Sequence, residues 1–204
     1  MSAAVVTGAG SGIGAAITER LRTEGWDVLT VDIRGQVDLR ADLTTRDGNR
    51  EAVDAAAQRF GGIDAVIPNA GFQHVSPIEE FPEDEWDALI ALMLTSPFLL
   101  ARYAWPYLKR TGRGRFTVIA SVHAIVASPY KAAYISAKHG VLGLVKTLAL
   151  ERAPDMASAP PRSAPATYGR PCSRGNSPAR PRRTRWTRSA CSRRSSSRRM
   201  RSSG

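Results

Sequence analysis

Three side chains in the second half of the chain could together move a proton on and off an oxygen atom. Tyr134 and Lys138 are four residues apart, so on a helix they share one face and can reach one cleft. A tyrosine with the ordinary pKa of about 10 is a poor base at neutral pH, but a nearby ammonium favours its phenolate. Ser121 precedes Tyr134 by 13 residues and follows an apolar run, so it can hydrogen-bond to the same substrate oxygen. Taken alone, the Tyr–Lys pair would also fit the solvated face of an amphipathic helix.

A glycine-rich segment near the N-terminus has the residues of a phosphate-binding turn. It reads Thr-Gly-Ala-Gly-Ser-Gly-Ile-Gly over residues 7–14. Such glycines permit a tight turn and close backbone approach, and they leave amide groups at a helix N-terminus to meet a pyrophosphate. A plain tight turn is the alternative, but the flanking strand and helix that the phosphate site requires are predicted here. We expect cofactor contacts from Gly8, Ser11, Gly12, Ile13 and Gly14.

Asp32 ends the second apolar run of the chain. At the end of a strand beside the glycine turn, its carboxylate can accept both hydroxyl groups of a ribose and would repel a ribose phosphate. This predicts NAD rather than NADP as the cofactor. A turn or helix-capping aspartate is the alternative for this residue alone.

The elements that must carry these residues alternate between strand and helix. Apolar runs predict strands, and apolar residues at helical spacing predict the helices between them. This βαβ alternation predicts an α/β fold, a doubly wound parallel (Rossmann) sheet that is incomplete at its C-terminal edge. We expect Pro97 and Pro106 to kink or end the first long helix. The expected strands are residues 3–7, 28–31, 65–67 and 116–120. We expect a first helix that begins after residue 12, and three further helices over residues 52–60, 83–109 and 130–152.

In these motifs the chain resembles the short-chain dehydrogenase/reductase family over about 150 residues. The glycine spacing matches, and Ser121, Tyr134 and Lys138 match the catalytic serine and the Tyr-x-x-x-Lys pair, of which the tyrosine and lysine also meet the cofactor. The resemblance implies hydride transfer between a small substrate and nicotinamide. It also implies a homotetramer built through the two long helices.

Two further pairs of residues match cofactor-binding positions of the family. The resemblance places Asp42 and Leu43 beside the adenine, with the Asp42 carboxylate meeting the adenine amino group. It places Asn69 and Gly71 at the end of the third long strand. One residue differs from the family pattern. Met93 stands where the family usually has an asparagine, which holds a water that relays protons from the lysine. We expect this relay to be built differently here.

Within the family, residues 71–78 and the neighbours of Ser121 resemble the 3-hydroxybutyrate dehydrogenases. The resemblance assigns Gln73, His123 and Lys131 to the carboxylate of the substrate, and Ser121 and Tyr134 to its reacting oxygen. An acid-binding pocket needs an ammonium and neutral donors around one point, which these residue types supply. Singly, each has a structural alternative as a loop amide, a loop histidine or a solvated lysine. The implied reaction converts (R)-3-hydroxybutyrate to acetoacetate in ketone body metabolism.

Charge divides the chain into a body of residues 1–153 and a tail of residues 154–204. The whole chain has a formal net charge of +11, but the tail alone has thirteen Arg and one acidic residue, so the body is almost neutral. This charge distribution disfavours a nucleic-acid surface across the body. The tail contains no Leu, Ile, Val or Phe, so it cannot bury enough apolar surface to fold, and we expect it to be disordered.

The remaining composition favours a cytoplasmic protein without a metal site. Both cysteines, Cys172 and Cys191, fall in the tail at a spacing that suggests neither a metal site nor a disulfide framework. The N-terminus lacks a basic leader, and no run of about 18 apolar residues occurs, so we expect no membrane segment.

The resemblance to the family stops near Pro154, where a buried strand and a Pro-Gly loop should follow. Reading one base out of frame, the codons for residues 163–172 permit Val-Cys-Pro-Gly-Tyr-Val-Arg-Thr-Pro-Leu, which is the missing segment. This predicts a frameshift near Pro154 or Asp155. Two alternatives remain: a nucleotide-binding protein without turnover, and a protein whose basic tail binds nucleic acid.

Overall fold

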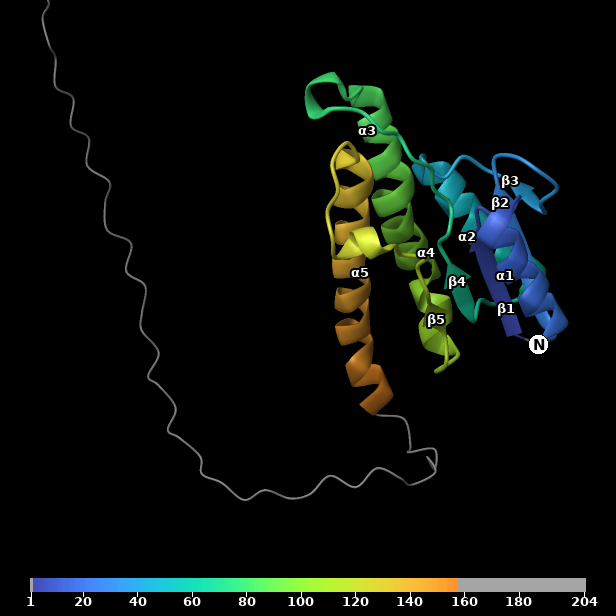
Figure 1. Cartoon of the computed structure of the whole chain (residues 1–204). Helices are drawn as coiled ribbons and strands as arrows, with labels where there is room; N and C mark the ends of the chain where they lie inside the picture. Colours follow the sequence, from blue (N-terminus) through green and yellow to red (C-terminus); the bar gives the residue numbers. More distant parts are fainter. Residues whose placement is uncertain (1, 158–204) are drawn as a thin grey trace, which may run out of the picture. The chain divides into compact units, whose positions relative to one another are not determined.

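The computed structural model describes residues 2–157. The predicted tail, apart from its first residues, lies outside the described residues. Strands and helices alternate along the described chain as the sequence predicts (Figure 1). In chain order the elements are β1 (Ser2–Thr7), α1 (Gly12–Thr23), β2 (Trp26–Asp32), β3 (Leu39–Arg40), α2 (Arg46–Phe60), β4 (Ala65–Ile67), η1 (Ile78–Glu80), α3 (Glu83–Ile90), η2 (Ala91–Thr95), α4 (Ser96–Arg110), β5 (Arg115–Phe116), η3 (Val122–Ala124) and α5 (Ala132–Ala157).

The strands form one parallel sheet in the order β3-β2-β1-β4-β5. β1 lies at its centre, where Val5 pairs with Leu29 of β2 on one side and with Val66 of β4 on the other. Because the strands are parallel, the C-terminal ends of β1 and β2 lie side by side, and the residues that follow them lie close together. The predicted doubly wound fold is confirmed.

Helices bury both faces of the sheet. Val5 of β1 belongs to a core made with α2 and α4, whereas its neighbours Ala4 and Val6 pack toward Ile17 and Leu21 of α1. Successive side chains of a strand point to opposite faces, so a strand covered on both faces must be apolar throughout. This is why β1 reads as an uninterrupted apolar run.

α3, η2 and α4 form one continuous helical segment, Glu83–Arg110. Pro97 and Pro106, which the sequence predicts to kink or end it, do not end it, because both lie within α4. Pro97 stands in the first turn of α4, directly after the π-helical turn η2, where the hydrogen-bond pattern changes and its missing N–H is tolerated. By length and hydropathy alone the segment could cross a membrane, but Leu100 and Leu108 are fully buried in the core with α2.

α5 lies alongside α3 and α4, away from β1 and β2 (Figure 1). The strand predicted for residues 116–120 is shorter in the structure, since β5 pairs only through Arg115–Phe116. Its extended backbone nevertheless continues, because the N–H groups of Thr117 and Ile119 donate to the carbonyls of Val66 and Pro68. Among the described residues this segment has a neighbour on one side only, and the incompleteness of the sheet at this edge stays a prediction.

Candidate active site

The glycine-rich segment turns the chain from β1 into α1. Gly8 and Gly12 have φ angles of +63° and +54°, left-handed values that favour glycine. Gly14 has no room for a side chain, because its Cβ would lie 2.1 Å from the carbonyl oxygen of Gly8. The free N–H groups at the start of α1 therefore stand at the end of β1, where an anionic group binds well.

Asp32 and Asn69 hold this turn from two sides. The Asp32 carboxylate accepts the N–H of Gly10 at 3.0 Å. The Asn69 side-chain amide donates to the carbonyls of Thr7 and Gly8 at 3.0 and 3.1 Å. The ends of β1, β2 and β4 are thus joined at one place by polar side chains.

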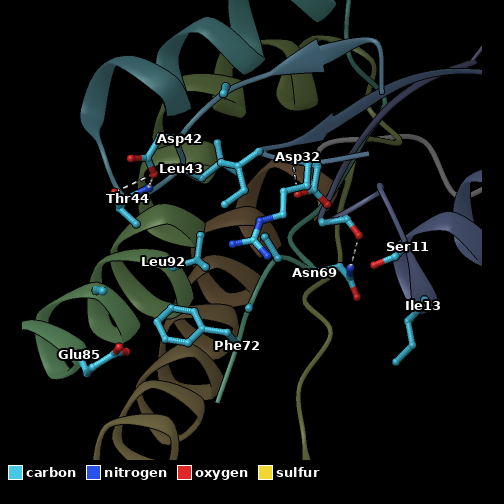
Figure 2. Close-up of a pocket in the computed structure, with 18 of the residues that line it drawn as sticks. Ser11, Ile13, Asp32, Asp42, Leu43, Thr44, Asn69, Phe72, Glu85 and Leu92 are labelled. Carbon is cyan, nitrogen blue, oxygen red and sulfur yellow. Dashed lines mark hydrogen bonds between the residues drawn. The ribbon is translucent and has the colours of Figure 1, made fainter. Parts of the chain in front are cut away.

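A cavity of about 980 Å³ opens beside this turn, a size that suits a small-molecule site. Figure 2 shows Asp32, Asn69 and Ser11 at one side of it and Asp42 and Leu43 at the other. The glycine cradle and the carboxylate at the end of β2 fit the pyrophosphate and ribose of a dinucleotide. The cavity brings together nine predicted cofactor residues: Gly8, Ser11, Gly12, Ile13, Asp32, Asp42, Leu43, Asn69 and Gly71.

A buried polar pair that the sequence analysis missed supports the far side of the cavity. Asn49 is fully buried, and its amide donates to the carbonyls of Leu43 and Thr45 while its oxygen accepts the hydroxyl of Ser96 at 2.7 Å. The carbonyl of Asp42 lies so close to Gly48 that a Cβ there would be 2.1 Å away. Asn49 shares a helix face with the buried Ala52 and Ala56. A polar residue on an otherwise apolar helix face is the sequence signal that could have identified Asn49.

Tyr134, Lys138 and Ser121 gather beside the end of β5. The Lys138 ammonium lies 5.6 Å from the centre of the Tyr134 ring, and the His123 ring packs edge-on against the same tyrosine at 6.0 Å. The Ser121 hydroxyl oxygen accepts the N–H of His123 at 3.2 Å. The predicted catalytic residues therefore share one neighbourhood, and His123 joins them there.

Lys138 is the one buried cation of this group, with 7% of its surface exposed. Burial disfavours its charged form and lowers the pKa of Lys138 below the ordinary value of 10.5. A single hydrogen bond, from Nζ to the carbonyl of Ile119 at 2.8 Å, satisfies one of its three N–H groups.

Comparison with known proteins agrees with this arrangement. Residues 2–158 match the family model described as short chain dehydrogenase. The chain belongs to the short-chain dehydrogenase/reductase family. The proteins of this family generally use the nicotinamide dinucleotides NAD or NADP.

Several relatives in the family are similar over most of the described chain. D-beta-hydroxybutyrate dehydrogenase of Rhizobium meliloti (strain 1021) is 40% identical over 166 residues, which cover 72% of this chain and 64% of that protein. D-threitol dehydrogenase of Mycolicibacterium smegmatis is 35% identical over 164 residues, 72% of this chain and 63% of that protein. The chain therefore spans slightly less than two thirds of the length of these curated relatives.

A solved structure of the family has the same fold. Ligand-free aldohexose dehydrogenase of Thermoplasma acidophilum superposes with a TM-score of 0.72 at 32% identity, covering 76% of this chain and 62% of that one. The fold thus carries more than one sugar or hydroxy-acid activity within the short-chain dehydrogenase/reductase family.

Gln73 and Lys131, the other two predicted substrate residues, lie in two separate loops. Gln73 is exposed in the loop after β4, and Lys131 directly precedes α5. Their two loops meet where the N–H of Ser76 donates to the carbonyl of Tyr130 at 3.0 Å. The described contacts do not bring the Gln73 and Lys131 side chains together, so their convergence stays a prediction.

Met93, which stands where the family usually has an asparagine, lies in η2. It is buried with Leu89, Ala133 and Ala137, and it packs beside Tyr134. Its sulfur replaces an amide that could hold a water, and its Cε would lie 3.1 Å from a Cβ built on Gly71, closer than an ordinary van der Waals contact. The side chain therefore fills space between the cofactor cavity and the tyrosine.

Proposed function

We propose that the chain is an NAD-dependent oxidoreductase that interconverts (R)-3-hydroxybutyrate and acetoacetate. The observation that carries this proposal is a chain of contacts in which Ser121 meets His123, His123 meets Tyr134 and Tyr134 meets Lys138, in the same fold as the cavity that suits a dinucleotide. The printed names of two relatives, at 40% and 39% identity, support the substrate.

The chain's own residues supply the proton chemistry. When bound, the nicotinamide supplies the hydride acceptor. Tyr134 takes the proton of the substrate hydroxyl, with the charge of Lys138 close to its ring. Since the Ser121 oxygen already accepts the N–H of His123, its own hydroxyl proton is left to donate to the substrate oxygen.

His123, Lys131 and Gln73 are the proposed partners of the substrate carboxylate. The His123 ring lies against Tyr134. A substrate carboxylate bound by His123 would therefore be separated from the reacting oxygen beside Tyr134 by only the short carbon chain of the substrate. Lys131 would contribute a charge-assisted hydrogen bond and Gln73 a neutral one. This set favours a short hydroxy acid over a neutral sugar or polyol.

Asp32 is the proposed reason for preferring NAD. Its carboxylate lines the cavity beside the glycine turn, where the ribose hydroxyls of the adenosine would lie. A phosphate on that ribose would meet a negative charge.

We also propose a cytoplasmic homotetramer associated through α4 and α5, on which Phe98 and Leu150 are 43% and 75% exposed. Light scattering of the purified chain would measure the mass of the assembly.

Steady formation of NADH from (R)-3-hydroxybutyrate is the test. The purified chain is assayed beside a version that follows the alternative reading frame from Asp155 onward, with (S)-3-hydroxybutyrate and D-threitol as comparison substrates. We expect the (R)-acid to be the preferred substrate and the frame-restored version to be more active. Oxidation of the polyol alone would contradict the substrate, and tight NADH binding by both versions without turnover would support a nucleotide-binding protein instead.

A further inference from the structure

Asn49 is a fully buried amide whose orientation is fixed by its partners. Its side-chain nitrogen lies 2.8 Å from the carbonyl oxygen of Leu43 and 2.6 Å from that of Thr45. A carbonyl oxygen can only accept, so both contacts require the NH₂ end of the amide. The amide oxygen is then left to accept the Ser96 hydroxyl at 2.7 Å. Both ends of the Asn49 amide are therefore used, in a single orientation.

These contacts join three segments of the chain. Leu43 and Thr45 belong to the loop that follows β3, Asn49 to the first turn of α2, and Ser96 to the first turn of α4. A serine in a helix commonly donates to a carbonyl one turn earlier in the same helix. Ser96 instead donates to Asn49, 47 residues away, directly after the π-helical turn η2. The bond therefore connects the long helical segment to the loop after β3.

Two of these segments form walls of the dinucleotide cavity. Asp42 and Leu43 line it from the loop, and Leu92 lines it from η2 (Figure 2). Leu92 lies one helical turn before Ser96, and it packs on the same core as Leu43. The bond between Ser96 and Asn49 therefore sets the distance between the loop wall and the helix wall of the cavity.

The other hydrogen bonds of the loop hold its local shape. The Asp42 carboxylate accepts the N–H and the hydroxyl of Thr44 at 2.9 and 2.7 Å, and the Thr45 hydroxyl donates to the Asp42 carbonyl at 2.8 Å. The partners in these bonds are at most three residues apart, so the bonds cannot fix where the loop stands relative to α4. The side chain of Asn49 supplies that link.

We propose that Asn49 and Ser96 are positioning residues for the adenosine half of the cofactor. Neither is among the residues that line the cavity, and they act by holding the loop of residues 42–45 at the separation from α4 that an adenine ring requires. A binding loop that is already in place loses less conformational freedom when the ligand arrives, so the ligand binds more tightly. The inference rests on the proposed function in one respect, that the cavity takes a dinucleotide with its adenine beside Asp42 and Leu43.

Asp64 provides a matched control at the other end of the sheet. It is also buried, and its carboxylate accepts the N–H of Ala3 at 3.0 Å, 61 residues away. Ala3 lies at the beginning of β1, whereas the cavity lies beyond the end of this strand. Asp64→Ala therefore breaks a buried hydrogen bond between distant residues, as Asn49→Ala does, without touching the adenosine region.

The experiment titrates the two halves of the cofactor separately into the full chain. ADP-ribose carries the adenosine, and reduced nicotinamide mononucleotide does not. Asn49→Ala should bind ADP-ribose about tenfold more weakly than the wild type and Ser96→Ala about threefold more weakly, the order expected when a net hydrogen bond is lost. The affinity of both variants for the mononucleotide should change by no more than about twofold. Asp64→Ala should lose stability in urea unfolding and keep its ADP-ribose affinity within about twofold.

The double variant Asn49→Ala/Ser96→Ala tests whether the two residues act as one unit. If they do, it should bind ADP-ribose no more weakly than Asn49→Ala alone. Losses that add in the double variant would contradict the link between the two residues.

Three further results would overturn the inference. They are single variants that bind ADP-ribose as the wild type does, equal losses for ADP-ribose and the mononucleotide, and an Asp64→Ala protein that loses as much ADP-ribose affinity as Asn49→Ala. If Asn49→Ala does not fold, Ser96→Ala, which removes a single hydroxyl, decides the question in the same titrations. Failure of the proposed function would be distinct, because a wild type that binds neither ligand has no dinucleotide site at all.

Discussion

The ammonium group of Lys138 donates a hydrogen bond to the carbonyl oxygen of Ile119, two residues before Ser121. This bond ties α5 to the extended segment that leads from β5 to the serine. It also fixes the distance between Lys138 and the backbone that carries Ser121, although the two residues lie 17 positions apart in the sequence. α5 and the segment that leads to Ser121 are therefore joined by a cation that the fold has buried.

Burial of Lys138 predicts a pH-dependent stability. Because its pKa is lowered in the folded state, the folded protein holds fewer protons than the unfolded chain as the pH approaches 10.5. The penalty of burying the charge is present below the folded pKa and disappears as the pH rises through it. The wild type should therefore gain stability relative to Lys138→Met as the pH is raised toward 10.5.

Urea unfolding of both proteins across this pH range measures the difference. Lys146→Met, which changes an exposed lysine of the same helix, is the control for general effects of charge. A wild type that loses stability relative to Lys138→Met as the pH is raised would contradict the assignment.

Replacing Tyr134 by phenylalanine should abolish most turnover. The ring that packs against His123 stays, and only the proton acceptor is lost, so we expect turnover to fall by about 10²- to 10⁴-fold. NADH affinity should change by no more than a few fold. The comparison variant is Tyr107→Phe, which removes a phenol hydroxyl from α4 beside Arg110. Activity of Tyr134→Phe within tenfold of the wild type would mean that another group is the base.

Gly14→Ala should damage the turn that carries the cofactor. Its methyl group would overlap the carbonyl of Gly8, which forces the glycine turn to move and costs about 1–3 kcal/mol of stability. NADH binding should weaken in parallel. In Gly143→Ala the added methyl group meets no atom within 4 Å, and helix propensity should raise the stability by up to about 1 kcal/mol. Equal effects of the two substitutions, in urea unfolding and NADH titration, would refute this role for Gly14.

The parts of the fold that the sequence predicts are those with a local signal. The middle of β1 and of β2 is mostly apolar because both faces of these strands are buried, and this pattern can be read directly. β3 has only two residues, too few for any pattern. α2 begins at Arg46, earlier than predicted, because the Thr45 side chain caps it by accepting the N–H of Gly48 while its first turn is polar.

The parts of the site that the sequence does not predict depend on contacts between distant segments. The Thr7 hydroxyl accepts the N–H groups of Asn69 and Ala70, more than 60 residues away. The pairing of Asn49 with Ser96 spans 47 residues. Arg34 reaches the cavity only because the bend after β2 curls back onto Gly10. A motif identifies the residues that meet a ligand, whereas these supporting contacts exist only once the chain has folded.

The one-sided pairing of the segment after β5 has a consequence for the order in which the molecule opens. Thr117 and Ile119 anchor the segment to β4, but within the described residues no strand lies along its other edge. A backbone held by half the usual hydrogen bonds has a lower free energy of local unfolding than the central strands. Ser121 thus follows a segment that opens more readily than the central strands, and a ligand that engages Ser121 and Lys138 together would hold this segment against β4, so that binding and local folding become one equilibrium.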